Sequence, residues 1–186
     1  MIEEKVMKKG IKIVLMLMAL MLLTVGCAKK ESASDATDNN VTLANPWSEV
    51  DKDTFVQKVH VSLNVPEWAS DVKYRVLDDG QGEPLGEMIF YIDGFEYVAR
   101  TQGVGEYTDI SGMYYDWTYE DKDKVSYNEV DVKKYVGDDE QATVCMWYDI
   151  VPGIMYSVST VQPDLDGLDI VAIAIAVYEP MQGEAG

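Results

Sequence analysis

The sequence predicts an α+β fold, in which an antiparallel β-sheet of about six to seven strands carries a short N-terminal helix and a buried C-terminal helix. Three features predict it. Asp93-Gly94 joins one pair of β-rich runs, Pro152-Gly153 joins another, and capping residues precede an apolar stretch near each end of the domain. Strand-like runs joined by tight turns are typical of antiparallel sheets.

The first helix is expected over residues 49–59. Ser48 and Asp51 stand three positions apart, as in a capping box with a shorter acid. Phe55 and Val59 are spaced so that they share one helical face. The pattern therefore predicts a short amphipathic helix.

A strand is expected over residues 72–77, where side chains alternate, and a β-hairpin follows it. Residues 87–92 and 95–100 flank Asp93-Gly94, the strongest short-range hairpin signal. The two-residue turn fixes the register and places Phe90 opposite Tyr97.

The same register puts six apolar side chains on one face, which we expect to be buried: Met88, Phe90, Ile92, Phe95, Tyr97 and Ala99. It also puts Glu87 opposite Arg100, in an ion pair that we expect to be exposed.

The remaining elements follow less regular patterns. We expect a strand at residues 113–120, a pair of short strands within 126–135, and a second hairpin from 142–149 and 154–160. Residues 167–178 predict a buried helix capped by Asp164 and Asp166. A strand is the alternative for that last segment, because large residues alternate with alanine.

The first 27 residues resemble the signal of a bacterial lipoprotein. Lysines precede an uncharged run at residues 13–23, and Thr24-Val25-Gly26-Cys27 ends the segment. A basic start, an apolar middle and small residues before a cut are typical of a secretory signal peptide. In the lipobox that this segment resembles, the cysteine receives a diacylglycerol and becomes the new N-terminus. A single-span anchor is the alternative, but the run is shorter than the roughly 20 residues that a span needs.

This interpretation divides the chain into three parts. Residues 1–26 are a lipoprotein signal peptide, residues 27–44 are a flexible tether from the lipidated Cys27, and residues 45–186 are a single domain. The tether is rich in Ser, Asp, Asn and Thr, which is typical of a linker. We therefore expect a lipid-anchored protein of the cell envelope, on the outer face of the cytoplasmic membrane.

Several segments of the domain, in their order, resemble small lipoproteins of Gram-positive, clostridial-type bacteria that carry a domain of unknown function. These segments are Asn45-Pro46-Trp47, residues 65–69, 90–100, 109–115 and 152–157, and the closing helix. The resemblance implies an antiparallel sheet flanked by an N-terminal and a C-terminal helix. It brings no known activity or ligand.

The charge of the chain limits its partners. It holds 33 acidic and 15 basic residues, a formal net charge of −18 at pH 7. Such an excess of acid argues against nucleic-acid binding, which needs clusters of Lys and Arg. It favours solubility and cationic partners. We expect no disulfide, because Cys27 and Cys145 are the two cysteines and the first is expected to carry lipid.

No motif for catalysis or for a metal stands out. Asp164, Asp166 and Asp169 surround a glycine, but the further ligands of an EF-hand loop are absent and helix capping explains the same residues. A Cys145–His60 pair is the one arrangement that would suit a nucleophilic hydrolase. We expect no cofactor, no metal and no enzymatic activity.

The high tyrosine content is a stronger indication of a binding site than any catalytic or metal motif in the sequence. Twelve Tyr and four Trp outnumber three Phe, and a tyrosine hydroxyl needs water or a bonded partner. Tyr115, Trp117 and Tyr119 stand at alternate positions, where they could line an exposed face for a peptide, glycan or acyl chain. A core face covered by the C-terminal helix is the preferred interpretation of the same pattern. Tyr91 and Trp47 are further candidates.

These observations favour a binding or sensory interaction module that contacts a protein, peptide or cell-wall partner. A carrier of an apolar or acyl ligand, held between the sheet and the C-terminal helix, is the alternative. An envelope hydrolase is a third hypothesis.

Overall fold

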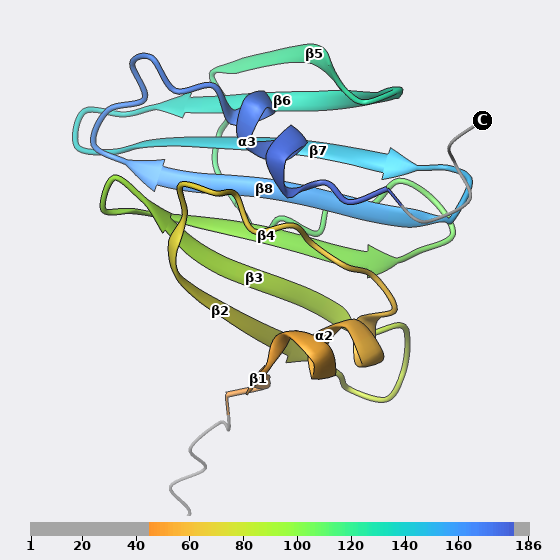
Figure 1. Cartoon of the computed structure of the whole chain (residues 1–186). Helices are drawn as coiled ribbons and strands as arrows, with labels where there is room; N and C mark the ends of the chain where they lie inside the picture. The colour runs from red at the N-terminus through yellow and green to blue at the C-terminus, as the bar shows by residue number, and fades with distance from the viewer. Residues whose placement is uncertain (1–44, 181–186) are drawn as a thin grey trace, which may run out of the picture. The chain divides into compact units, whose positions relative to one another are not determined.

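The computed structural model describes residues 45–180. The predicted signal peptide, Cys27 and the predicted tether lie outside the described residues. Eight antiparallel strands form one sheet in the order β1-β2-β3-β4-β8-β7-β6-β5, and two helices accompany it (Figure 1). The α+β class and the antiparallel sheet are thus confirmed, with eight strands rather than six to seven.

The strands are β1 (Trp47–Val50), β2 (Ser70–Leu77), β3 (Leu85–Ile92), β4 (Phe95–Gly103), β5 (Tyr119–Val125), β6 (Asn128–Val136), β7 (Gln141–Asp149) and β8 (Ile154–Gln162). The helices are α2 (Lys52–Val59) and α3 (Ile170–Val177). Among the described residues, no helix is long and apolar enough to cross a membrane.

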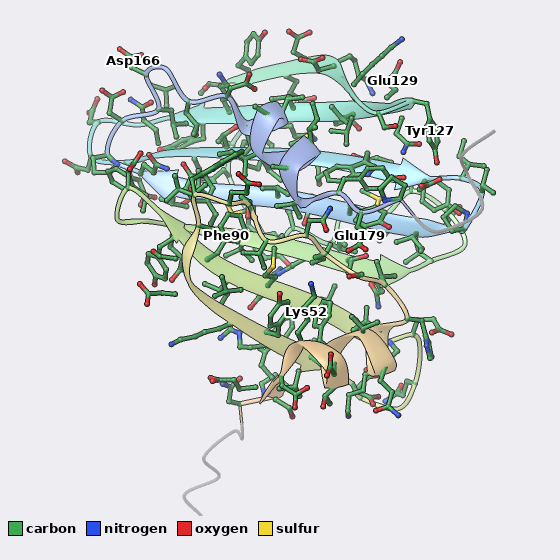
Figure 2. The ribbon with its side chains drawn as sticks, viewed as in Figure 1. Lys52, Phe90, Tyr127, Glu129, Asp166 and Glu179 are labelled. Carbon is green, nitrogen blue, oxygen red and sulfur yellow. The ribbon has the colours of Figure 1, made fainter. Side chains whose placement is uncertain are left out.

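The β3–β4 hairpin has the predicted register. Phe90 pairs with Tyr97, and their rings stack with centroids 5.6 Å apart. Asp93 and Gly94 have φ angles of 52° and 84°, as a type I′ turn requires. Phe90 is fully buried, on the sheet face that the helices cover (Figure 2). Of the six side chains expected on this face, Phe95 is an exception, because it is exposed at the turn.

The N-terminal helix begins later than predicted. Trp47–Val50 pairs with β2 as a strand, and α2 starts only at Lys52. Asp51 is itself the N-cap, since its carboxylate accepts a hydrogen bond from the Thr54 N–H at 2.7 Å. Asp51 thus caps the helix without the box predicted from Ser48.

The middle of the chain differs most from the prediction. Residues 113–118 form no strand, and β5 begins at Tyr119. The two short strands expected within residues 126–135 are one continuous strand, β6, because the turn falls at Ser126 and Tyr127. Ser126 has a φ of 57°, a turn conformation that sequence patterning does not reveal in a serine.

The segment after β8 contains the predicted C-terminal helix, α3, and not the alternative strand. Its N-cap is Asp169, which accepts from the Ala172 N–H at 3.0 Å, rather than Asp164 or Asp166. Both helices pack on the same face of the sheet and share one main core with it: Phe55, Val59, Met88, Phe90, Trp147, Tyr156, Ile173, Ala174 and Val177 are among its members. Residues 104–118 cover part of the opposite face, where a small cluster joins Ile110, Val144, Met146 and Met155.

The prediction that Glu87 and Arg100 form an exposed pair is wrong. Glu87 is 1% exposed, and its carboxylate accepts hydrogen bonds from both Arg75 and Arg100, the latter at 2.9 Å. Both guanidinium groups lie over the Trp47 ring, at 5.4 and 5.5 Å from its centroid. Arg100 also donates to the carbonyl of Ile110, so the covering loop and β1 bury what the hairpin alone would expose.

Candidate functional site: a pocket at one end of the sheet

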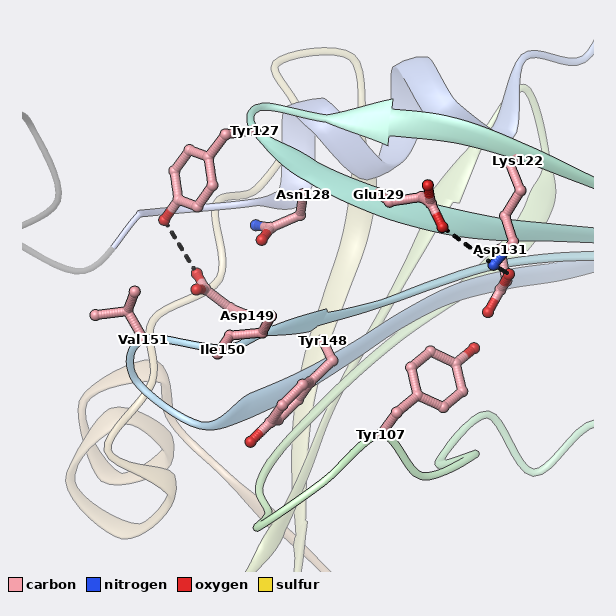
Figure 3. A pocket seen from close by; sticks show the side chains of 10 residues that line it. All are labelled: Tyr107, Lys122, Tyr127, Asn128, Glu129, Asp131, Tyr148, Asp149, Ile150 and Val151. Atoms are coloured by element: carbon pink, nitrogen blue, oxygen red, sulfur yellow. Dashed lines mark hydrogen bonds and ion pairs between the residues drawn. The ribbon is translucent and has the colours of Figure 1, made fainter.

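A pocket of about 550 Å³ opens where the β5–β6 and β7–β8 turns lie side by side (Figure 3). Its walls come from the two turns, from the adjoining ends of the strands and from the loop after β4. The lining residues are Tyr107, Lys122, Tyr127, Asn128, Glu129, Asp131, Tyr148, Asp149, Ile150 and Val151.

Asp149 is the central acidic group of this end of the sheet. It is the last residue of β7 and 1% exposed. Its Oδ2 atom accepts hydrogen bonds from the Tyr178 hydroxyl at 2.7 Å and from the Tyr127 hydroxyl at 3.4 Å. Its Oδ1 atom is buried and has no hydrogen-bond partner among residues 45–180. A buried carboxylate oxygen without a donor is costly, which makes this atom a candidate acceptor for a ligand.

Asn128 supplies a donor beside this acceptor. It is 8% exposed, and its buried Nδ2 atom has no hydrogen-bond partner in the described part of the chain. Asp131 pairs with Met146 across β6 and β7; continuing that register by three residues places Asn128 opposite Asp149. Figure 3 shows the amide and the carboxylate next to each other at the end of the sheet. The site therefore presents an acceptor and a donor side by side.

Tyr178 does not line the pocket itself but holds the Asp149 carboxylate from the core side. Its ring packs edge-on against Trp147 and Tyr156, with centroids 5.9 and 5.4 Å away, and its backbone forms an isolated bridge with Leu63. Burial, aided by hydrogen bonds with Tyr127 and Asp149, raises the pKa of Tyr178. The hydroxyl thus stays protonated and donates to Asp149.

The rings of Tyr107 and Tyr148 and the ammonium group of Lys122 line the mouth of the pocket. Lys122 forms an ion pair with Asp131 and lies 3.4 Å from the carboxylate of Glu129. Burial, and then the hydrogen bond to Asp131, raises the pKa of Tyr107. The Tyr148 hydroxyl donates to the carbonyl of Val104 at 3.3 Å, which holds the loop after β4 against the sheet.

Two apolar residues form the outer lip. Ile150 and Val151 are 79% and 80% exposed, although both are aliphatic. The turn that carries them closes when the Gly153 N–H donates to the carbonyl of Asp149 at 3.0 Å. Gly153 has a φ of 71°, which favours glycine, and its own carbonyl accepts from Val104. The position of this lip is therefore fixed by backbone bonds.

The site residues predicted from sequence lie outside this pocket and do not form one common site. Trp47 stacks on the Arg75–Arg100 pair, and the Tyr91 hydroxyl donates to Glu96 at 2.5 Å. Tyr115 and Trp117 contact each other on the sheet face opposite α3, with ring centroids 5.6 Å apart.

Tyr119 is 50% exposed on the edge strand β5, and its hydroxyl donates to Asp121 at 2.6 Å. Of the three alternating aromatics, Tyr115 and Trp117 are half-buried. The Tyr115 ring also contacts Tyr135, with centroids 4.9 Å apart. The three thus do not form one open face, and α3 is not what covers them.

The residues weighed for catalysis and metal binding are separated. Burial raises the pKa of Cys145 to about 12, whereas an activated nucleophile needs a lowered one. His60 is exposed at the end of α2. Within residues 45–180, no group of three His, Cys, Asp or Glu side chains is placed to hold a metal ion.

Sequence analysis missed Asn128 and Asp149. A usable signal existed for Asp149: it stands two positions after Trp147 and four after Cys145, so it shares their core face in the predicted strand. A carboxylate at a core position is uncommon and points to a special role. Asn128 gave no such signal, because its strand was misassigned.

Comparison with known proteins adds no precedent for this site. No family model matches the chain, and no curated protein or solved structure is found to be similar to it.

Proposed function

We propose that the chain is a lipid-anchored, extracytoplasmic binding module whose ligand site is the pocket between the β5–β6 and β7–β8 turns. The observation that carries the proposal is the pair of buried, unpartnered polar groups on Asn128 and Asp149. Ligand sites typically combine apolar walls with a few placed polar groups. The exposed lip of Ile150 and Val151 supplies such an apolar wall.

The anchor half of the proposal is supported by the sequence. Residues 1–27 resemble a lipoprotein signal, and the domain resembles small clostridial-type lipoproteins. We include in the proposal that the domain is related to these lipoproteins. Metabolic labelling with a fatty-acid analogue tests it: label should attach to the wild-type chain and be lost in Cys27→Ser. Equal label in both chains would contradict a lipid on Cys27.

The alternative of an apolar carrier has less support. It needs an open space between the sheet and α3, but Ile173, Ala174 and Val177 of the helix are buried there. Beneath them Trp147 and Tyr156 stack at 5.1 Å. These side chains fill the interface where α3 lies over β7 and β8. The hollow at the start of α3 is lined instead by charged residues such as Asp121, Lys122 and Asp123, which do not suit an acyl chain.

Affinity capture tests the pocket half of the proposal. The immobilised chain is incubated with solubilised bacterial envelope, and bound molecules are identified by mass spectrometry. Val151→Arg places a charged side chain at the lip and should abolish capture. Val136→Arg is the matched control, because Val136 is also exposed but lies at the opposite end of β6. Equal capture by the two variants would place binding outside the pocket.

A further inference from the structure

We infer that the pocket binds the free amino terminus of a peptide, with Asp149 accepting from the α-ammonium group and Asn128 donating to the first carbonyl. The inference rests on the proposed function, and it names the ligand class of the same site. It goes beyond that function because binding alone does not specify which chemical group is recognised.

The first argument is the unmatched charge of Asp149. Its carboxylate is 1% exposed, and none of the ion pairs within residues 45–180 includes it. Two tyrosine hydroxyls share Oδ2, which leaves Oδ1 without a donor. A buried carboxylate is stabilised most by a cation that also hydrogen-bonds to it. The missing partner is therefore a cationic donor.

The second argument selects an ammonium group among cations. A metal ion would need several ligands, and no cluster of three stands in the described part of the chain. A guanidinium group prefers both oxygens of a carboxylate, but Oδ2 of Asp149 already accepts from Tyr178. A compact ammonium group can bond to the single remaining oxygen. Lys122 shows the same chemistry at the mouth of the pocket, where it binds Asp131 and Glu129.

The third argument places the ammonium group at a peptide terminus. Figure 3 shows the Asn128 amide next to the Asp149 carboxylate, and its Nδ2 donor has no hydrogen-bond partner among residues 45–180. An α-amino group and its neighbouring carbonyl present a donor and an acceptor within one residue. A lysine side chain would leave Asn128 unpaired, because its ammonium group is far from any carbonyl. The first side chain of the peptide would then contact Ile150 and Val151, which are apolar and exposed.

Tyr127 controls access to this site. Its side chain is half exposed on the β5–β6 turn, and its hydroxyl points at Asp149 (Figure 3). The hydrogen bond of 3.4 Å is long, so a charged donor can displace it. The entering amino terminus would bond to Oδ1, the weak bond of Tyr127 to Oδ2 would yield, and the Tyr127 ring would remain beside the cation.

Titration of the full-length chain in non-ionic detergent, followed by NMR, tests the inference. The probes are leucyl-glycinamide and its Nα-acetyl derivative, which differ in the free ammonium group. We expect the Asn128 side-chain amide resonance to shift with the free peptide, and the acetylated peptide to bind at least tenfold more weakly. Equal binding, or no binding of the free peptide, would overturn the inference. Either of these results would leave the proposed function to be tested independently by the affinity-capture experiment.

Variants separate the site from the general charge of the chain. Asp149→Asn should weaken the free peptide at least tenfold, whereas Glu49→Gln removes an exposed charge on β1 and should change nothing. Tyr127→Phe keeps the ring and removes a hydroxyl that donates to the same carboxylate, so the carboxylate becomes a better acceptor for the ammonium group and binding should tighten roughly two- to fivefold. Equal effects of Asp149→Asn and Glu49→Gln, or weaker binding by Tyr127→Phe, would refute the assignment. If Asp149→Asn unfolds the domain, Tyr127→Phe still tests the inference, because Tyr127 is exposed and its replacement should not disturb the core.

Discussion

Replacement of Glu87 by glutamine should destabilise the domain strongly, although the change is isosteric and far from the pocket. Glu87 is buried between Arg75 and Arg100, whose side chains are 32% and 19% exposed. Glutamine keeps one acceptor oxygen but removes the charge, and it leaves two guanidinium groups stacked on Trp47 without a counter-ion. Breaking a buried ion pair typically costs about 3–5 kcal/mol.

The partial exposure of both arginines allows some rehydration, which places the expected loss near the lower end, at about 3 kcal/mol. Urea unfolding, followed by tryptophan fluorescence, measures it as a lower midpoint at constant slope. Glu120→Gln is the control, because Glu120 is 63% exposed and 3.6 Å from Lys133. Its loss should stay well under about 1 kcal/mol. A Glu87→Gln loss as small as the control's would refute the buried role of Glu87.

Three further outcomes are expected. Phe90→Ala should cost roughly 3–5 kcal/mol in urea unfolding, because Phe90 is fully buried against Tyr97, whereas Phe95→Ala should cost far less at its exposed position; similar losses would contradict the assigned faces of the hairpin. The native, mature chain should show no reactive thiol at pH 8, since the pKa of Cys145 is raised to about 12 by burial, and one thiol after denaturation. Two thiols in the denatured chain would mean that Cys27 carries no lipid. Excess EDTA should leave the melting temperature unchanged, because the described residues hold no metal cluster; a drop of many degrees would reveal a structural ion.

The β-hairpins were predictable because their turns carry a strong local signal. Asp93-Gly94 tolerates positive φ at both positions, so the dipeptide set the turn type and the register before any tertiary contact was known. Pro152-Gly153 also marked the second hairpin, but its turn spans residues 150–153, and of the two residues Gly153 alone has a positive φ. The alternation of side chains in residues 113–118 correctly predicted that their exposure alternates along the chain. Such alternation does not distinguish a loop from a paired strand, which is why the strand expected here was wrong.

The burial of Glu87 could not be predicted, because it depends on contacts between distant segments. Arg75 comes from β2, Arg100 from β4 and Trp47 from β1, and the loop at Ile110 closes over them. The pocket was hidden for the same reason. Asp149 meets Tyr178 from the end of the chain and Tyr127 from a turn that gave no glycine or proline signal. Hydroxyl and amide groups of this kind become a site only when the sheet brings them together.

Hydrogen–deuterium exchange of the full-length chain, with and without the ligand captured from the envelope, tests the central claim most directly. If the pocket is the binding site, protection should increase in peptides that cover residues 126–131 and 147–153, and in the loop around Tyr107. Residues 113–119, which contain the aromatic side chains predicted from sequence, should exchange unchanged. Protection confined to residues 113–119, or to the segments around Trp47 and Tyr91, would contradict a binding site in the pocket. It would instead indicate that the aromatic residues predicted from sequence form the site.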